Sequence, residues 1–140
     1  MSNGNIYTVN PNFLSVLGTI DDSSKKLIVA ELKDKRNRLI WALRLQLGLE
    51  PINLRISRLR ARLEELHAEF REQYPNPEQS IPYNDETMVA IRGSNQLLRS
   101  LNQNLENQLR SIFPDSKVPT VQENRKSLFK IDRLLMQIRL

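Results

Sequence analysis

Leucine and isoleucine recur three and four residues apart in four long segments between residues 23 and 140. A helix that buries one side marks that side with this spacing, because 3.6 residues complete one turn. No run of alternating apolar and polar residues lies between turn signals, as a half-buried strand would require. The sequence therefore predicts an all-α fold, a helical bundle of four long helices plus a short N-terminal helix.

Prolines, glycines and capping side chains mark the ends of these helices. Pro51 suits the first turn of one helix, and Gly48 suits the C-terminal cap of the helix before it. Thr120, with Glu123 three residues later, forms the capping-box pattern for the last helix. The residues predicted to be helical are about 11–18, 24–47, 51–74, 85–113 and 121–140.

The second predicted helix changes character along its length. Residues 33–38 read KDKRNR, which indicates either a solvated stretch of helix or a break in it. From Leu39 to Leu47 apolar side chains point all around the axis, a pattern typical of a helix that is buried on several sides or serves two interfaces. Trp41, Phe129 and Met136 lie off the main seams, where they fit either a partner surface or a multilayer core. For Trp41 we expect the core.

The most regular apolar seam runs through residues 52–70, where steps of four and three alternate over nearly three heptads. Its members are Ile52, Ile56, Leu59, Leu63, Leu66 and Phe70. After it, residues 75–84 hold three prolines and no helical period. At 140 residues the chain has the length of one ordinary domain. We expect a single helical domain over residues 1–140, in which helical pairs 24–74 and 85–140 are joined by this proline-rich linker.

The charge of the chain is +5 overall and is unevenly distributed. Residues 33–62 carry nine basic residues against two acidic ones, a net charge of +7. Residues 63–86 carry one basic residue against seven acidic ones, a net charge of −6. Residues 87–140 carry nine basic residues against four acidic ones, a net charge of +5. Alternating fields of this kind suit both head-to-tail protein docking and phosphate binding.

Two predicted helices carry basic stripes beside or opposite their apolar seams. The first basic stripe, in the helix that begins near residue 85, comprises Arg92, Arg99, Gln103 and Arg110. The second basic stripe, in the last helix, comprises Lys126, Lys130 and Arg133. Such side chains donate to phosphates and sugars without reading base sequence. If the two stripes lie on adjacent helices, they make a groove with positive walls; the alternative is an ordinary solvated face, or for the amide-rich first stripe a polar helix–helix interface.

A secondary basic cluster lies beside the heptad seam and comprises Arg55, Arg58 and Arg62. Glu65 follows Arg62 by three residues, which predicts a local ion pair. Such a pair absorbs part of the positive charge, so this cluster is a weaker candidate for phosphate contact than the two stripes.

Catalytic and metal-binding patterns are missing from the sequence. There is no cysteine, which excludes a disulfide framework and a cysteine nucleophile, and the single histidine, His67, has no second ligand to work with. The isolated glycines form no phosphate-binding loop. We therefore expect no enzyme activity, no cofactor, no metal and no small-molecule substrate. The first residues show no signal-peptide pattern, and no apolar segment of the sequence is long enough to span a bilayer. We therefore expect a cytoplasmic protein without membrane contact.

The favoured hypothesis is a non-catalytic basic helical subunit that binds nucleic-acid phosphates, independently of base sequence, within a multi-subunit nucleoprotein complex. In size, charge and architecture the chain is similar to the helical small subunits of CRISPR effector complexes, an analogy that carries over no residue. Other protein subunits or a second copy of the chain are expected partners. The alternative is a protein-only helical scaffold or assembly factor that oligomerises through the seam of residues 52–70 and the apolar end of the second helix.

Overall fold

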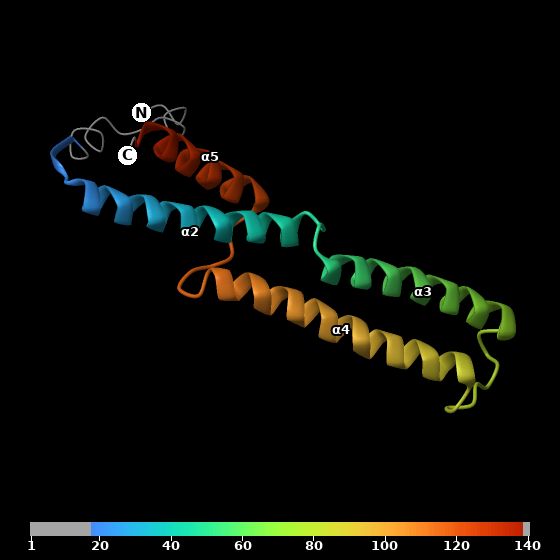
Figure 1. Cartoon of the computed structure of the whole chain (residues 1–140). Coiled ribbons are helices and arrows are strands. Elements are labelled where there is room, and N and C mark those ends of the chain that lie inside the picture. Colours follow the sequence, from blue (N-terminus) through green and yellow to red (C-terminus); the bar gives the residue numbers. More distant parts are fainter. Residues whose placement is uncertain (1–17, 139–140) are drawn as a thin grey trace. The chain divides into compact units, whose positions relative to one another are not determined.

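The computed structural model describes residues 18–138, and all regular secondary structure in this part of the chain is helical. The all-α prediction is thereby confirmed. The long helices are α2 (Asp22–Gln46), α3 (Pro51–Gln73), α4 (Glu86–Ile112) and α5 (Val121–Gln137) (Figure 1). The short N-terminal helix predicted over residues 11–18 lies, except for Gly18, outside the described residues.

The helices form two compact units. One unit contains α2 and α5, from the described residues of Met1–Leu47 and Ile112–Leu140, and the other, Gly48–Ser111, contains α3 and almost all of α4. The predicted pairs, 24–74 and 85–140, are therefore not the pairs that form. Residues 75–84 do not separate two pairs, because they turn the chain back so that α4 packs against α3. The prediction of one domain over residues 1–140 is a separate matter and stays a prediction.

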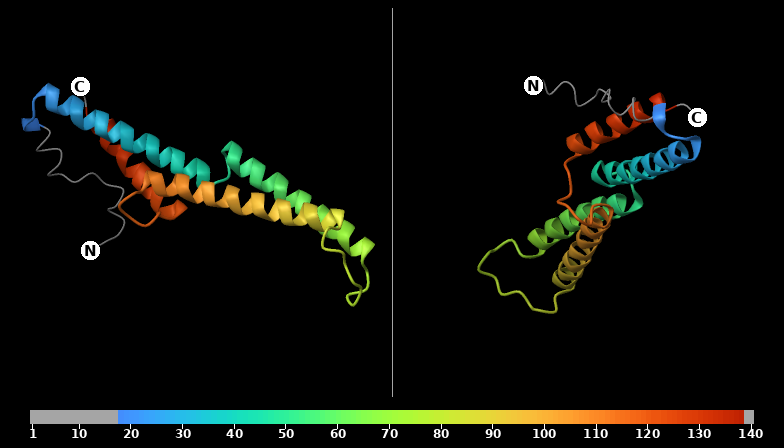
Figure 2. Two further views of the ribbon diagram at one scale, coloured as in Figure 1. Left: turned by 90° about the horizontal axis from the view of Figure 1, so that it is seen from below. Right: turned by 90° about the vertical axis from the view of Figure 1, so that its left-hand side faces the viewer.

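In the first unit α2 and α5 lie side by side (Figures 1 and 2). Leu39, Ala42, Leu43 and Leu45 are buried on α2, and Ile131 is buried on α5. α2 is continuous through residues 33–38, so that charged stretch is a solvated part of the helix and not a break.

Polar contacts also join the two helices of this unit. The side-chain amide of Asn124, which is 1% exposed, donates to Oε1 of Gln46 at 2.9 Å. The amide nitrogen of Gln46 in turn donates to the carbonyl oxygen of Pro119 at 2.7 Å. At the more exposed edge, Nε of Arg36 donates to Oδ1 of Asp132 at 2.6 Å. The buried amide pair satisfies polar groups that would otherwise lose their water partners.

Side-chain hydrogen bonds cap the starts of α2 and α5, and a glycine follows the end of α2. The carboxylate of Asp21 accepts the backbone N–H of Ser24, which starts α2. After the C-cap of α2, Gly48 adopts a φ of 79°, a left-handed conformation that favours glycine. The capping box predicted for α5 is confirmed, since Thr120 and Glu123 each accept the backbone N–H of the other.

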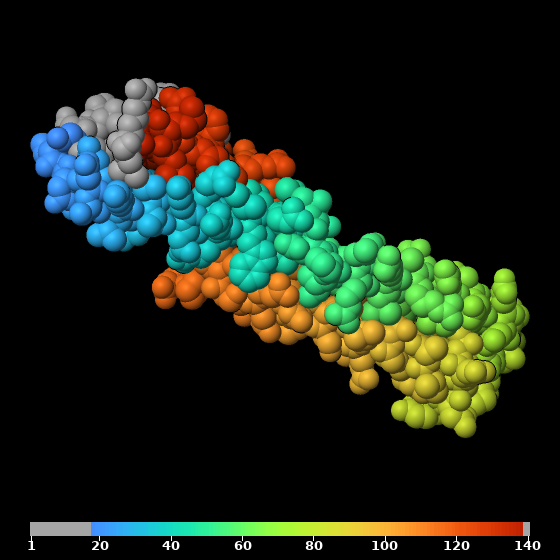
Figure 3. Space-filling view, in the orientation of Figure 1, coloured from blue at the N-terminus to red at the C-terminus, as the bar shows by residue number. Residues whose placement is uncertain are grey.

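In the second unit, α3 and α4 form a helical hairpin whose core joins Leu63 and Leu66 of α3 to Ile91 of α4. Phe70, Ala90 and Leu98 pack around these three residues. Figure 3 shows the side chains of α3, in green, meeting those of α4, in yellow to orange. The part of the seam from Leu63 to Phe70 therefore packs within the chain, against α4.

The three apolar residues that lie off the main seams in the sequence, Trp41, Phe129 and Met136, are exposed in the structure. Trp41 on α2 is 41% exposed, so the prediction that it lies in the core is wrong. Phe129 and Met136 on α5 are 46% and 78% exposed. Each lies off its helix's seam, and in a helix pair only one face of each helix meets the other. These residues are thus surface features.

Candidate nucleic-acid interface

The outer face of α5 gathers four cationic side chains around one aromatic ring. The residues that form it are Arg125, Lys126, Phe129, Lys130, Arg133 and Met136. They project away from the seam of α5, whose members Ile131 and Ile138 are buried. Because residues three and four apart are neighbours on a helix surface, the four cations lie close together along this face. Lys126 is half-buried and the other three cations are exposed.

The two acidic side chains of α5 offset this charge only in part. Glu123 belongs to the capping box, where the hydrogen bond from the backbone N–H of Thr120 lowers the pKa of its carboxyl group. Asp132 accepts from Arg36 of α2. Among the described residues, none of the four cations has an ion-pair partner within 4 Å. Glu123 still interacts electrostatically with Lys126, but Arg125, Lys130 and Arg133 are exposed and have no ion-pair partner among the described residues, so the outer face of α5 keeps a positive charge.

The first basic stripe, on α4, is mostly engaged by its own surroundings. One guanidinium nitrogen of Arg92 donates to the carbonyl oxygen of Tyr83 at 2.6 Å, and the guanidinium lies over the Tyr83 ring, 4.2 Å from its centroid. Arg110 is paired with Glu106 at 2.5 Å. Arg99 is exposed and makes no ion pair with a described residue. Of the three arginines, Arg99 alone keeps its charge available without the loss of a contact.

The amide side chains of α4 bond along the helix. The amide nitrogen of Gln103 donates to Asn107, and that of Gln108 donates to Asn104, both at 3.0 Å. Each pair spans four residues, the spacing that places side chains above one another on a helix. Gln103, predicted as a phosphate donor, therefore has one donor occupied within its own helix.

The secondary cluster on α3 divides in the same way. The ion pair predicted between Arg62 and Glu65 is confirmed, with 3.0 Å between Nη1 and the carboxylate oxygen, and Glu69 lies 3.6 Å from the same nitrogen. Arg55 and Arg58 are exposed and have no ion-pair partner among the described residues. His67 is exposed as well, on the same helix.

The structure does not place the two basic stripes in one unit. The first stripe lies on α4 within Gly48–Ser111, whereas the second lies on α5. A groove with both stripes as its walls is therefore not a feature of either unit, and each stripe has to be judged alone. By that standard the outer face of α5 is the stronger candidate, since its cations are not paired internally.

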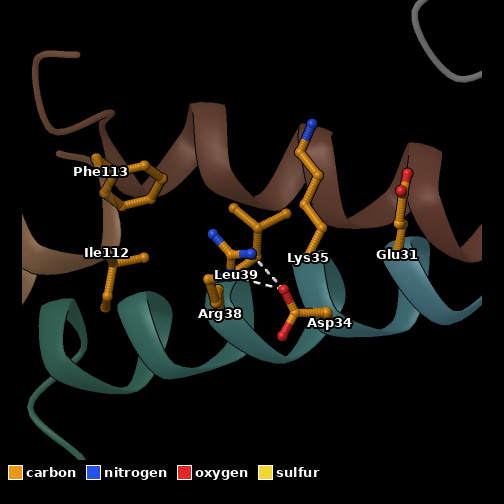
Figure 4. A pocket seen from close by; sticks show the side chains of 7 residues that line it. All are labelled: Glu31, Asp34, Lys35, Arg38, Leu39, Ile112 and Phe113. Atoms are coloured by element: carbon orange, nitrogen blue, oxygen red, sulfur yellow. Dashed lines mark hydrogen bonds and ion pairs between the residues drawn. The ribbon is translucent and has the colours of Figure 1, made fainter. Parts of the chain in front are cut away.

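A pocket in the first unit differs from the outer face of α5 in its charge. It lies along α2 and is lined by Glu31, Asp34, Lys35, Arg38, Leu39, Ile112 and Phe113 (Figure 4). Arg38 is paired with Asp34 across its wall, and Glu31 adds a second carboxylate. This mixture of two acids and two bases largely cancels, so the pocket does not favour a polyanion.

Arg125 and Phe129 belong to the α5 face, although the sequence-based stripe omitted them. The predicted stripe was built by counting four and then three residues on from Lys126, which gives Lys130 and Arg133. Arg125 and Phe129 do not fall at these positions. The spacing of Arg125, Phe129 and Arg133, each four residues after the last, was the available signal.

Other kinds of site find less support in the described residues. Between residues 18 and 138, no group of three or more histidine, cysteine, aspartate or glutamate side chains lies close enough to hold a metal ion. None of the helices described is both long and apolar enough to cross a membrane. Comparison with protein-family models, with curated proteins and with solved structures gave no match to this chain.

Proposed function

We propose that this chain is a non-catalytic helical protein that binds nucleic-acid phosphates through the outer face of α5, within a larger nucleoprotein complex. The observation that carries the proposal is the set of four cations on this face, none of them in an ion pair within the described residues. Of the two acids of α5, Asp132 is paired with Arg36, and Glu123 is held in the capping box and offsets only part of the charge through Lys126. A polyanion supplies the charge that this face lacks.

The chemistry of these contacts implies binding without base specificity. Lysine and arginine neutralise phosphates and release the counterions condensed on the nucleic acid, so the affinity falls as salt is added. Phosphate contacts fix position and carry no direct sequence information. On the first basic stripe, Arg99 is the best placed to add a contact, because it is exposed and unpaired among the described residues.

Charge reversal on α5 tests this proposal directly. The double variant Lys130→Glu with Arg133→Glu should nearly abolish binding to fluorescently labelled DNA and RNA of random sequence, measured by anisotropy over a range of salt concentrations. The matched control is Lys26→Glu with Lys33→Glu, which changes the net charge equally through two exposed residues of α2 in the same unit. Equal losses in the two double variants would show that only net charge matters, and unchanged binding in the first would refute the proposal.

A protein-only scaffold is the second candidate, favoured by large apolar side chains that remain exposed. Leu54, Leu97 and Trp41 are 50%, 47% and 41% exposed. The heptad seam of residues 52–70 supports oligomerisation less well than expected, because Leu63 and Leu66 already pack against Ile91 of the same chain. Sedimentation equilibrium tests this alternative: a stable oligomer that loses mass in the variant Trp41→Ser, combined with no nucleic-acid binding, would favour the scaffold.

A further inference from the structure

A polar pocket on α4 differs from the pocket on α2, because its walls carry positive charge and no acid. It has a volume of about 330 Å³ and is lined by Tyr83, Arg92, Asn95, Gln96 and Arg99, all within the unit Gly48–Ser111. The sequence of α4 contains no acidic residue between Glu86 and Glu106. This polar pocket therefore favours an anion, which the mixed pocket on α2 does not.

The four α4 side chains of the polar pocket are close neighbours on the helix surface. Asn95 and Gln96 follow Arg92 by three and four residues. Arg99 in turn follows the same two residues by four and three. Side chains at these spacings have Cβ atoms about 5–6 Å apart. Two amides therefore lie between two arginines, so hydrogen-bonding groups and positive charge meet at one place.

The two arginines of the pocket differ in how they are held. Arg92 is half-buried, donates to the carbonyl oxygen of Tyr83 and lies over the ring of the same residue. Neither of these groups is charged, so Arg92 still adds to the positive potential of the pocket. Arg99 is exposed and makes no ion pair with a described residue. Arg99 is therefore the side chain available for direct contact with an anion.

The two amides narrow the class of ligand. The side chains of Asn95 and Gln96 make no hydrogen bond to another described residue, in contrast to the amide pairs further along α4. An amide side chain both donates and accepts, and a hydroxyl group does the same. The ribose of RNA carries such a hydroxyl, on the carbon next to the one that bears the 3′ phosphate, and DNA lacks it. A ribose with its phosphate thus matches both kinds of group in the pocket.

An acidic protein surface is the competing partner, and it fits the pocket less well. A carboxylate only accepts hydrogen bonds. It would pair with Arg99 and use the donors of Asn95 and Gln96, but it would leave the two amide oxygens to water. A ribose and its phosphate engage the guanidinium, the amide donors and an amide oxygen together.

Resting on the function proposed above, we infer that the polar pocket on α4 is a ribose-phosphate site that selects RNA over DNA. In this site Arg99 contacts a phosphate, while Asn95 and Gln96 form hydrogen bonds with the 2′-hydroxyl group of the adjoining ribose. Contacts to the backbone carry no direct sequence information, so binding stays independent of base sequence.

The test uses labelled oligo(U) and oligo(dU) of equal length, which differ only at the 2′ position, with the full chain at one salt concentration. By fluorescence anisotropy the wild-type protein should bind oligo(U) about threefold to tenfold more tightly, the effect of one or two hydrogen bonds. Oligo(U) that is methylated on every 2′ oxygen lacks the hydroxyl donor, and it should bind no more tightly than oligo(dU). Equal affinity of the wild-type protein for oligo(U) and oligo(dU) would overturn the inference.

Exchange of the two amides tests the residues themselves. Asn95→Leu with Gln96→Met keeps the size of both side chains and removes their hydrogen bonds. It should lower the affinity for oligo(U) to that for oligo(dU) and leave the latter unchanged. The matched control is Asn104→Leu with Gln108→Met, the same exchanges in two residues of α4 that are bonded to each other, and it should keep the preference for RNA. Circular dichroism verifies that each variant retains its helices.

Arg99→Gln tests the phosphate contact separately from the sugar contact. Because both nucleic acids offer the same phosphates, this change should weaken binding to oligo(U) and oligo(dU) by the same factor and leave the preference for RNA in place. If Arg99→Gln changes neither affinity, the inference is overturned. If a polyglutamate peptide binds with an affinity that depends on Asn95, Gln96 and Arg99, and RNA and DNA bind equally, the pocket belongs to an acidic protein partner.

The outcomes separate this inference from the function on which it rests. If Lys130→Glu with Arg133→Glu leaves all binding intact, the proposed function of α5 fails, while a preference for RNA that depends on Asn95 and Gln96 would still support the α4 site. If that reversal abolishes binding but the amide variant keeps the preference for RNA, the phosphate-binding function stands and the ribose-phosphate site on α4 is overturned.

Discussion

The phenol of Tyr74 donates a hydrogen bond of 2.6 Å to Oδ1 of Asp85, and so joins the C-cap of α3 to the start of α4. The second carboxylate oxygen of Asp85 accepts the backbone N–H of Met88 at 3.1 Å. Beside this contact, the hydroxyl of Thr87 donates to the amide oxygen of Gln73 at 3.0 Å. These contacts hold together the two ends of the proline-rich segment that connects the helices.

This contact makes the stability of the α3–α4 hairpin depend on pH at both extremes. The hydrogen bond from Tyr74 lowers the pKa of Asp85 below its ordinary value of 3.8, so its stabilisation is present above that pH and is lost as the pH falls through the lowered value. The same bond raises the pKa of Tyr74 above 10.0, so that contribution is lost only as the pH rises through the raised value.

Tyr74→Phe should therefore lower the urea midpoint at neutral pH and flatten its pH dependence in both acid and alkali. Circular dichroism at a series of pH values measures this. The control Tyr83→Phe removes the hydroxyl of a side chain that is 82% exposed, and it should keep the wild-type pH profile. A Tyr74→Phe profile parallel to that of the wild type would show that the hydrogen bond contributes nothing in solution.

Truncation in the core of the hairpin should have a large effect. Leu63 is 7% exposed and packs with Leu66 and Ile91, so Leu63→Ala removes buried methyl groups and leaves a cavity. The free energy of unfolding should fall by about 2–5 kcal/mol. Arg58 lies exposed on the same helix, and Arg58→Ala should change it by no more than about 0.5 kcal/mol. Equal losses in urea titrations of the two variants would mean that α3 is rotated relative to this description.

The buried amide pair of the first unit should behave as a coupled unit. Asn124 is 1% exposed, and Asn124→Ala removes the donor that Oε1 of Gln46 accepts from. This change should lower the free energy of unfolding by about 1–3 kcal/mol. Gln46→Ala removes the partner of both Asn124 and the Pro119 carbonyl. The double variant should lose less stability than the sum of the two single variants. Strict additivity in a double-mutant cycle would contradict the coupling.

The helices and their caps were predictable because both depend on residues close in sequence. The capping box of Thr120 and Glu123 spans three residues, and Pro51 fixes the start of α3 at one position. The pairing of the helices was not predictable from the same signals. A Leu and Ile seam shows which face of a helix is buried, but every seam in this chain has similar chemistry, so it does not show which helix it meets.

Asn124 carried a signal for the α2–α5 pair that the apolar pattern alone missed. It precedes Leu128 by four residues, and Ile131 and Leu135 continue the same spacing, so an amide occupies a position of the buried seam. A single polar residue in such a seam selects a partner that satisfies it. That partner is Gln46, 78 residues away, and nothing in the local sequence identifies it.

For the candidate site, the sequence indicated three of the four cations on α5, but it did not show which basic side chains of the chain are paired internally. Glu106 precedes Arg110 by four residues, and Glu65 follows Arg62 by three, both spacings at which side chains meet on a helix, and both pairs form in the structure. The contact of Arg92 with Tyr83 was not readable in this way, because Tyr83 lies outside the helix, in the segment before α4.

The internal pairing of Arg110 leads to a last prediction, about the two basic stripes. Arg110→Gln and Lys130→Gln each remove one positive charge, yet Glu106 already offsets the first of these charges. Lys130→Gln should therefore lower the slope of log affinity against log salt by about one unit, and Arg110→Gln should lower it by clearly less. Glu106→Gln frees Arg110 and should strengthen binding. If the two neutralised variants change the salt slope equally, the α4 stripe contacts phosphates as directly as α5 does, and internal ion pairs do not decide which cations bind.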